Sequence, residues 1–462
     1  MAALTLHPDR FFPSDGDTRR IARELFARVE QLPLICPHGH ADAGWFARDQ
    51  PFEDATSLLL WPDHYLLRTL YSQGIRLEEI GVGNPSADRR AAWKLFAANF
   101  HIFRGTPSRL WLDHVFAQLF GIDVRLTADT ADFYFDTIGR ALATPAFRPR
   151  ALFRAFNIEK IATTEGALDV LADHDCLARE WPGRVITTYR PDDVIDPEQP
   201  NFVSNIETFC AGQHSLSWPG YLKAHRDRRA YFRARGATAT DHGHPTAQTA
   251  DLPAHEAQGL FDRLLGGRRE PGDAELFRAQ MLTAMAEMSC DDGMVMQLHA
   301  GPFRNHNKEL FSKFGPDKGG DLPSRTEYVR ALKPLLDRFG NRRELTLILF
   351  TLDPATYARE LAPLAGHYPC IKLGPAWWFH DSPDGMLRFR RETTETAGFY
   401  NLAGFNDDTR AFLSIPARHD LARRVDASYL AELVATHRLD MGEAEELIVD
   451  LAYNFPKAAY KL

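Results

Sequence analysis

The chain has 462 residues, 44% of them hydrophobic and 25% charged, so it can bury a large core as one α/β barrel or as two to three smaller domains. A formal net charge of −8 argues against nucleic-acid binding. No apolar run has the length of a membrane span and the N-terminus has no secretory pattern, so neither membrane association nor export is expected.

The cysteines indicate a reducing compartment. There are five of them, scattered along the chain with no Cys-x-x-Cys pair: Cys36, Cys176, Cys210, Cys290 and Cys370. An odd, sparse set argues against a disulfide framework and against a structural zinc knuckle. We therefore expect reduced thiols in a cytoplasmic protein.

Short, apolar, β-branched segments predict the strands of a parallel sheet. They cover residues 32–38, 158–164, 184–190, 294–299, 345–352 and 368–374, with a weaker candidate at 399–407. Helical patterns separate most of them, for example at 274–288, 326–339 and 355–364. Strands that alternate with helices indicate parallel βαβ units. Seven candidates with one unrecognised favour a (β/α)8 TIM-like barrel, and an open doubly wound sheet is the alternative.

Two stretches are too long to be simple connections between a strand and a helix. Residues 41–157 contain helical patterns and predict a mostly helical insertion over the barrel mouth, after the first strand. Residues 191–275 predict a long insertion of loop and helix. We therefore expect an N-terminal segment with the first strand (1–40), the helical insertion (41–157) and the remainder of the barrel (158–462).

Residues capable of chemistry recur where the predicted strands end, which is where barrel enzymes place their active sites. His38 and His40 follow the first strand, and residues two apart on a strand point the same way. Arg190 and His299 end two later strands, Trp377 follows another, and Asp408 follows the last candidate. Alone, His-x-His predicts a ligand pair only weakly, His299 could be a buried strand cap, and Asp408 could cap a helix.

Together, His38, His40, His299 and Asp408 indicate a site for one divalent metal ion and resemble the amidohydrolase superfamily. Binuclear hydrolases of that superfamily carry a lysine at the end of the fourth strand. The segment compared with it here, 186–190, ends in Arg190 instead. A single ion is therefore expected, and the arginine suggests an anionic ligand, because guanidinium binds carboxylate in a bidentate manner.

Longer motifs make the resemblance specific. The chain resembles the uronate isomerase (glucuronate isomerase) family, a divergent branch of that superfamily, in segments spread over most of its length. The matching segments are Pro37-His38-Gly39-His40, Asp63-His64-Tyr65 with Arg68, Tyr189-Arg190-Pro191-Asp192, Met296-Gln297-Leu298-His299 with Arg304-Asn305-His306-Asn307, Gly315-Pro316-Asp317, Trp377-Trp378-Phe379 with Asp384-Gly385-Met386, Asp408-Thr409-Arg410, and Ala452-Tyr453-Asn454.

The chain departs from the family pattern at three places. Gly39 stands where the family usually has another residue, and Asp407-Asp408-Thr409-Arg410 replaces Thr-Asp-Ser-Arg. Glu165-Gly166 stands where the family has an acidic pair, which puts a role for that strand end in doubt. The Asp-x-Arg spacing survives.

The resemblance implies interconversion of an aldehyde-form hexuronate and its 2-keto isomer, such as D-glucuronate and D-fructuronate or D-galacturonate and D-tagaturonate, through an enediol. It implies Zn²⁺ or Mn²⁺ bound by His38, His40 and Asp408, with His299 as a fourth ligand or substrate contact. No nicotinamide or flavin is needed. The other roles it implies are Asp408 as base, Tyr65 and His64 as proton shuttles, Arg190, Arg410 and Arg68 as substrate-binding residues, and Trp377 as a pocket wall.

Two other functions fit parts of this pattern. A metal-dependent hydrolase of an amide or lactone needs the same histidines and aspartate, but has no particular use for Arg190 and Arg410. A non-catalytic sugar-acid-binding or structural protein would not need intact strand ends. A homo-oligomer is also possible, since the insertion rich in Trp and Phe could meet another subunit.

Overall fold

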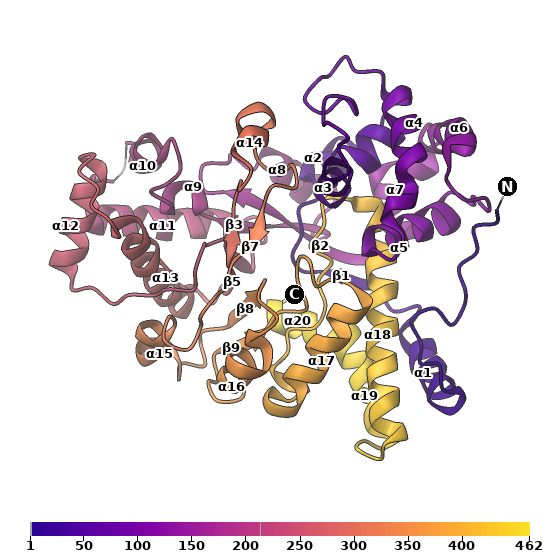
Figure 1. Cartoon of the computed structure of the whole chain (residues 1–462). Helices are drawn as coiled ribbons and strands as arrows, with labels where there is room; N and C mark the ends of the chain where they lie inside the picture. The colour runs from indigo at the N-terminus through magenta and orange to yellow at the C-terminus, as the bar shows by residue number, and fades with distance from the viewer. Residues whose placement is uncertain (1, 213) are drawn as a thin grey trace.

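The computed structural model describes residues 2–212 and 214–462. Within these residues, seven parallel strands form one sheet in the order β1-β2-β3-β4-β5-β8-β9, so strands that follow one another in this sheet are neighbours. The sheet lies at the centre of the molecule with helices around it (Figure 1). Each of the six firmly predicted strands is present, and the predicted α/β barrel class is confirmed. The strands are β1 (Leu34–Cys36), β2 (Ile158–Gly166), β3 (Val185–Arg190), β4 (Ala239–His242), β5 (Val295–Ala300), β8 (Leu347–Thr351) and β9 (Ile371–Leu373).

The weak candidate at 399–407 occupies the eighth position without forming a regular strand. Leu402 makes a single parallel bridge to Leu373, and the backbone N–H of Ala403 donates to the Leu373 carbonyl at 2.8 Å. On the other side, the N–H of His40 donates to the Thr409 carbonyl at 3.1 Å. We call residues 402–409 the closing segment. Gly404 has a φ of 78°, which a regular ladder does not accommodate.

One strand was missed. Residues 191–275, expected to be loop and helix, contain β4, which pairs with β3 and β5. The prediction is wrong for these four residues because Thr240, Asp241 and His242 are polar yet fully buried. Strand recognition relies on apolar side chains, and here hydrogen bonds and ion pairs stabilise the buried positions instead.

Helices fill both long stretches between strands. Residues 41–157 hold α2 to α7, which gather at the upper right of Figure 1. The remaining helices surround the sheet. The bounds in the first stretch are α2 (Ala43–Arg48), α3 (His64–Ser72), α4 (Arg89–Asn99), α5 (Pro107–His114), α6 (Ala131–Leu142) and α7 (Pro149–Ala155). Those that follow are α8 (Ala172–Glu180), α9 (Asp192–Ile195), α10 (Phe202–Cys210), α11 (Trp218–Arg233), α12 (Ala254–Leu265), α13 (Asp273–Asp292), α14 (Lys308–Phe314), α15 (Lys333–Phe339), α16 (Ala362–Ala365), α17 (Pro383–Ala397), α18 (Ile415–Ala435), α19 (Met441–Val449) and α20 (Phe455–Tyr460). A short antiparallel pair, β6 (Pro302–Phe303) and β7 (Leu322–Pro323), lies outside the main sheet.

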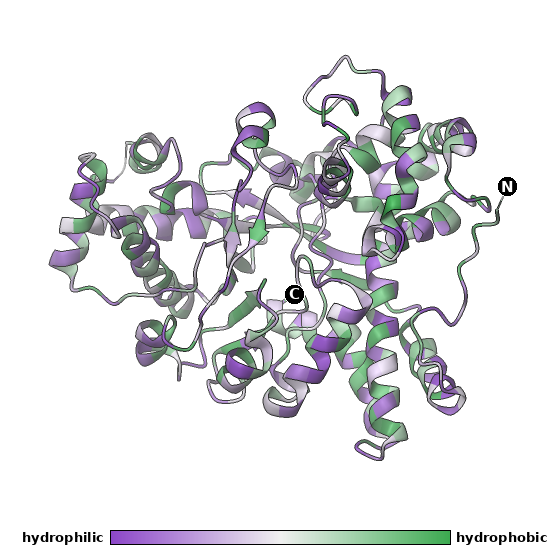
Figure 2. Ribbon diagram, in the orientation of Figure 1, coloured by the Kyte–Doolittle hydropathy of each residue, from purple (hydrophilic) through white to green (hydrophobic). Residues whose placement is uncertain are grey.

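The two ends of the chain meet in the core. Helix α1 (Gly16–Val29) packs along α18 and α19, as the indigo and yellow ribbons show in Figure 1. Leu25 and Val29 are fully buried there, and the Arg424 guanidinium lies 4.1 Å from the centre of the Phe26 ring. Strands β1 and β8 are hydrophobic, whereas many surrounding helices alternate between hydrophilic and hydrophobic residues (Figure 2). Among the described residues, no helix combines the length and apolar composition needed to cross a bilayer.

Candidate active site

A pocket lies where the strands end, and it brings together nearly all the predicted site residues. Only one of them lies elsewhere. Arg68 lines an adjoining cavity, which shares Tyr65, Gly319 and Asp381 with the main pocket. The predicted residues that line the main pocket are His38, His40, His64, Tyr65, Arg190, His299, Trp377, Asp408 and Arg410.

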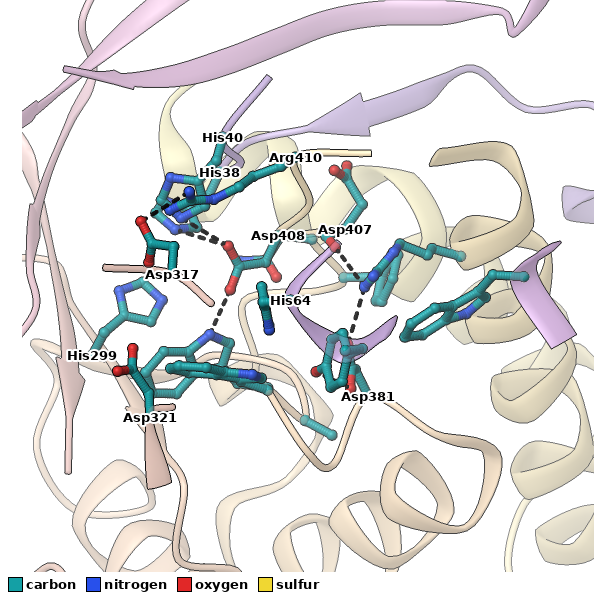
Figure 3. A pocket seen from close by; sticks show the side chains of 18 of the residues that line it. His38, His40, His64, His299, Asp317, Asp321, Asp381, Asp407, Asp408 and Arg410 are labelled. Carbon is teal, nitrogen blue, oxygen red and sulfur yellow. Dashed lines mark hydrogen bonds and ion pairs between the residues drawn. The ribbon is translucent and has the colours of Figure 1, made fainter. Parts of the chain in front are cut away.

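The Asp408 carboxylate lies beside the two histidines that follow β1 (Figure 3). Its Oδ1 atom is 3.4 Å from His38 Nε2 and 3.2 Å from His40 Nε2. The His299 ring stacks on the His38 ring, with their centres 4.7 Å apart. Residues from the first, fifth and last positions of the barrel therefore converge on one point.

The backbone at Asp408 is held in a strained conformation. Its φ is 38°, in the left-handed region that non-glycine residues rarely adopt. The side chain is fixed at the same time, because Trp377 Nε1 donates a hydrogen bond to Asp408 Oδ2 at 2.5 Å. Strain of this kind is tolerated where the surroundings determine the geometry, and it is concentrated at functional sites.

The protonation states of Asp408, His40 and His299 suit a cation. Burial opposes ionisation of Asp408, but His38 and His40 hold the pKa of its carboxyl well below the usual range. Burial lowers the pKa values of His40 and His299, which favours their neutral form. Burial also acts on His38, but Asp241 and Asp408 outweigh it and raise the pKa of His38.

Asp241, on the missed strand β4, orients His299. Its Oδ1 is 2.6 Å from His299 Nδ1, and its Oδ2 is 3.0 Å from an Arg190 guanidinium nitrogen. Asp241 is fully buried. Burial opposes its ionisation, but Arg190 and His299 bring the pKa of Asp241 well below the usual range. The carboxylate therefore holds His299 with Nε2 free to face the pocket.

Arg190 is fixed on its other side as well. Its Nε donates to Asp192 Oδ2 at 2.8 Å. A Cβ on Gly243 would lie 2.1 Å from an Arg190 guanidinium nitrogen, so only glycine leaves room for this side chain. Arg190 ends β3, so the earlier comparison of this segment with a fourth strand is wrong. The fourth strand ends in Asp241-His242 and has no lysine either.

Arg410 is less constrained than Arg190. It contacts Asp317 Oδ2 at 3.0 Å, and 40% of its side chain is exposed. Asp317 belongs to the loop at 315–321, which packs against α3. A Cβ on Gly319 would lie 2.5 Å from Arg68 Cβ, so the loop can approach this closely only with glycine there. Arg410 can therefore exchange Asp317 for an incoming anion.

Tyr65 and His64 enter the pocket from the start of α3. Asp63 caps this helix by accepting hydrogen bonds from the N–H groups of Tyr65 and Leu66 at 2.9 and 3.2 Å. The His64 ring stacks on Tyr65 with centres 4.7 Å apart, and burial lowers the pKa of His64 to about 3. His64 is therefore neutral and can accept a proton only weakly.

The histidine and aspartate set could hold a metal ion. One possible ligand atom from each of His38, His299 and Asp408 lies within 4.8 Å of the others. His299 Nε2 and Asp408 Oδ1 are buried and have no hydrogen-bond partner among the described residues. In a tetrahedral zinc site, ligand atoms are about 3.3 Å apart. The 3.2 and 3.4 Å separations around Asp408 are close to that value.

Comparison with known families shows to which family the chain belongs. The sequence model of the family described as glucuronate isomerase matches residues 16–460. The chain belongs to the glucuronate isomerase family. It is therefore an enzyme of the aldose–ketose isomerase class, as the resemblance implied.

Relatives and solved structures agree with this family over the whole chain. A uronate isomerase of Phenylobacterium zucineum is 64% identical, with 99% of this chain and 97% of that protein covered. A glucuronate isomerase structure from Caulobacter crescentus is 61% identical with a TM-score of 0.98, covering 99% of this chain and 97% of that one. A uronate isomerase from Thermotoga maritima is 26% identical, with a TM-score of 0.92 and 99% of both chains covered.

Glu165, which belongs to one of the three segments that depart from the family pattern, does not line the main pocket. Its carboxylate accepts a hydrogen bond from Thr187 and lies 3.6 Å from His174 Nε2. Burial raises the pKa of Glu165 to about 7. At a pH between the usual carboxyl pKa and about 7, Glu165 is therefore protonated in the folded protein and ionised in the unfolded chain.

Glu165→Gln is expected to stabilise the isomerase at pH 8 but not at pH 4. In the wild type, the free energy of unfolding falls as the pH rises from the carboxyl pKa of the unfolded chain to about 7, because the folded protein then has to release the Glu165 proton. Glutamine does not ionise, so the variant avoids this decrease, which amounts to at most about 3 kcal/mol. Urea unfolding at both pH values measures this difference. Glu24→Gln, at an exposed position, is the control. Equal effects at both pH values would contradict the raised pKa.

Several pocket residues were not predicted. Asp381 and Arg418 lie far from Tyr65 in sequence, so no local pattern marks them. Asp317 was noted only as part of a family motif. Asp241 could have been found from the second His-x-His of the chain, His242-Gly243-His244, because polar residues of this kind often follow a strand.

Proposed function

We propose that this isomerase interconverts D-glucuronate with D-fructuronate, and D-galacturonate with D-tagaturonate, through an enediol. The observation that carries the proposal is a pocket that contains both a His38–His40–Asp408 cluster and a partly exposed arginine, Arg410, which has one carboxylate contact, with Asp317. Hydrolysis of an amide or lactone would need the cluster but not the arginine. The cytoplasmic location and the homo-oligomer stay predictions.

His38, His40 and Asp408 would hold one divalent ion, with His299 as the fourth ligand. The fit rests on the buried Asp408 Oδ1 and His299 Nε2 atoms, which have no hydrogen-bond partner among the described residues, and on neutral His40 and His299. Imidazole and carboxylate ligands suit Zn²⁺, with Mn²⁺ as the second choice. When bound, the ion would polarise and orient oxygens of the substrate.

Asp408 would remove the proton from C2 and return it to C1. Its low pKa keeps the carboxylate ionised, and its strained backbone and the hydrogen bond from Trp377 fix its direction. The C2–H bond breaks, an enediol forms, and a C1–H bond is made. Meanwhile the hydroxyl proton on O2 must move to O1. Tyr65 is better suited to that transfer than His64, whose pKa is about 3.

Arg410 would bind the substrate carboxylate. Arg190 is already paired with Asp192 and Asp241, so it is better suited to positioning His299 through Asp241. Arg410 has one carboxylate contact and an exposed side chain. Trp377 would form a wall of the pocket. Arg68, in the adjoining cavity, would meet the substrate only on its way in.

The direct test is turnover of the two aldehyde-form hexuronates. Purified protein, stripped of metal with a chelator and then supplied with Zn²⁺ or Mn²⁺, is incubated with glucuronate or galacturonate while the ketose is followed. We expect activity only after an ion is restored. If neither hexuronate is converted under any of these conditions, the proposed function is wrong.

Arg410→Lys is expected to weaken hexuronate binding more than it slows the reaction. Lysine keeps the charge but cannot form two parallel hydrogen bonds to a carboxylate. We expect the KM to rise about tenfold, with a smaller change in kcat, consistent with the loss of one charge-assisted hydrogen bond. Steady-state kinetics check this. Arg438→Lys, in a surface pair with Glu395, serves as the control. An unchanged KM would contradict the role.

A further inference from the structure

The hydroxyl group of Tyr65 is already engaged in two hydrogen bonds. It donates to Asp381 Oδ1 at 2.8 Å and accepts from the backbone N–H of Phe379 at 3.0 Å. A phenol has only one proton to donate. While Asp381 is ionised, Tyr65 can accept a proton from a substrate but cannot donate its own. Proton transfer by Tyr65 alone therefore does not explain its hydrogen bond to Asp381.

Asp381 is in turn held by Arg418. The second carboxylate oxygen, Oδ2, is 3.0 Å from an Arg418 guanidinium nitrogen. That guanidinium lies 3.6 Å from the centre of a Trp111 ring and donates to the Asp407 carbonyl at 3.3 Å. Asp381 and Arg418 both line the main pocket, and the Arg418 residue is 5% exposed. The carboxylate of Asp381 therefore lies in a fixed position next to Tyr65.

We propose that Asp381 stores the hydroxyl proton during isomerisation, as the partner of Tyr65 in a two-step relay. The proton on O2 passes to the Tyr65 oxygen while the Tyr65 proton passes to Asp381 Oδ1. Both transfers then reverse, and the proton is delivered to O1. No proton is gained or lost, and the transfer between C2 and C1 by Asp408 is separate. This inference rests on the proposed hexuronate isomerisation.

The surroundings suit a carboxylate that takes up a proton transiently. Burial raises the pKa of Asp381, whereas Arg418 and the hydrogen bond from Tyr65 act in the opposite direction. Burial likewise raises the pKa of Tyr65 well above its usual range, so a free phenolate is unfavourable. Passing the Tyr65 proton on as another arrives avoids that phenolate.

Asp381→Asn separates storage from mere positioning. Asparagine retains one oxygen that can accept the Tyr65 hydrogen bond, but it cannot take up the proton, and its amide nitrogen replaces the oxygen that accepts from Arg418. We expect kcat to fall about 100-fold with KM changed by less than about threefold, in the range of general acid–base effects. Tyr65→Phe should cause a similar loss. The double variant should be no slower than the slower single variant, because both changes interrupt one relay.

Two further variants serve as controls for Asp381→Asn. Asp381→Glu preserves a carboxyl group and should be about tenfold faster than Asp381→Asn. Asp426→Asn disturbs a comparable buried ion pair, with Arg390 at 2.7 and 2.9 Å, outside the main pocket, and should leave kcat unchanged. Thermal unfolding of each variant measures any loss of stability.

The outcomes distinguish the relay from the proposed function. If the wild type converts no hexuronate, the proposed function is wrong. If the wild type is active but Asp381→Asn keeps kcat within about threefold, Asp381 only positions Tyr65 and the relay is wrong. Losses that multiply in the double variant, or equal activities of the Asp381→Glu and Asp381→Asn variants, would also overturn it.

Discussion

Asp408→Asn is expected to lower kcat about 1,000-fold while the protein stays folded. Asparagine cannot accept the C2 proton and is a poorer metal ligand than carboxylate. Like aspartate, it tolerates a left-handed backbone, so the φ of 38° adds no new strain. Its amide oxygen can still accept the hydrogen bond from Trp377.

Three measurements separate the effects of Asp408→Asn. Kinetics with glucuronate measure kcat, circular dichroism measures folding, and metal analysis measures the bound ion. Asp49→Asn is a matched control, because Asp49 also has a left-handed backbone, with a φ of 48°, and caps α2 away from the main pocket. The control should keep wild-type activity. An Asp408→Asn variant with wild-type kcat would rule out the role of Asp408 as the base.

Arg190→Gln is expected to lower the free energy of unfolding by about 3–5 kcal/mol, the cost of leaving a buried charge without its partner. Asp241 is fully buried, and Arg190 is its charged partner at 3.0 Å. His299 alone would then have to stabilise the carboxylate. His299 should also be less firmly positioned, so the activity should fall as well.

A second substitution checks the cause. Asp241→Asn in the Arg190→Gln background removes the uncompensated charge, so much of the lost stability should return. Arg391→Gln is the control, since Arg391 pairs with Glu432 at the surface and its loss should cost at most about 1 kcal/mol. Urea unfolding compares the four proteins. If Arg190→Gln costs no more than Arg391→Gln, the buried pair does not stabilise the fold as argued.

The strand ends could be predicted because two independent signals coincide there. An apolar β-branched run marks each of the predicted strands, and a polar residue marks the strand end at His38, Arg190 and His299. The parallel topology then brings those ends to one edge of the sheet. The four proposed metal ligands could therefore be named together before their geometry was known, although their ligand role stays a prediction.

The other parts lack the apolar runs on which strand prediction relies, or they join residues that are far apart in sequence. The buried residues of β4 are polar, because Asp241 forms part of a chain of charges from Arg190 to His299. The contact between Tyr65 and Asp381 joins residues 316 positions apart, and nothing near either one indicates it. The predicted helix at 326–339 is helical only from Lys333 in the structure, because side chains such as Glu360, which accepts from the Tyr328 N–H, bind the preceding backbone.

The closing segment has a consequence for how the molecule folds. It joins β1, near the N-terminus, to β9, so the barrel is completed by parts of the chain more than 300 residues apart in sequence. Contacts between distant parts of the chain form slowly, because a large loop must be closed before they contribute stability. The junction between His40, which follows β1, and Thr409 should therefore form late, and the His40 amide hydrogen should exchange with solvent sooner than those between β5 and β8.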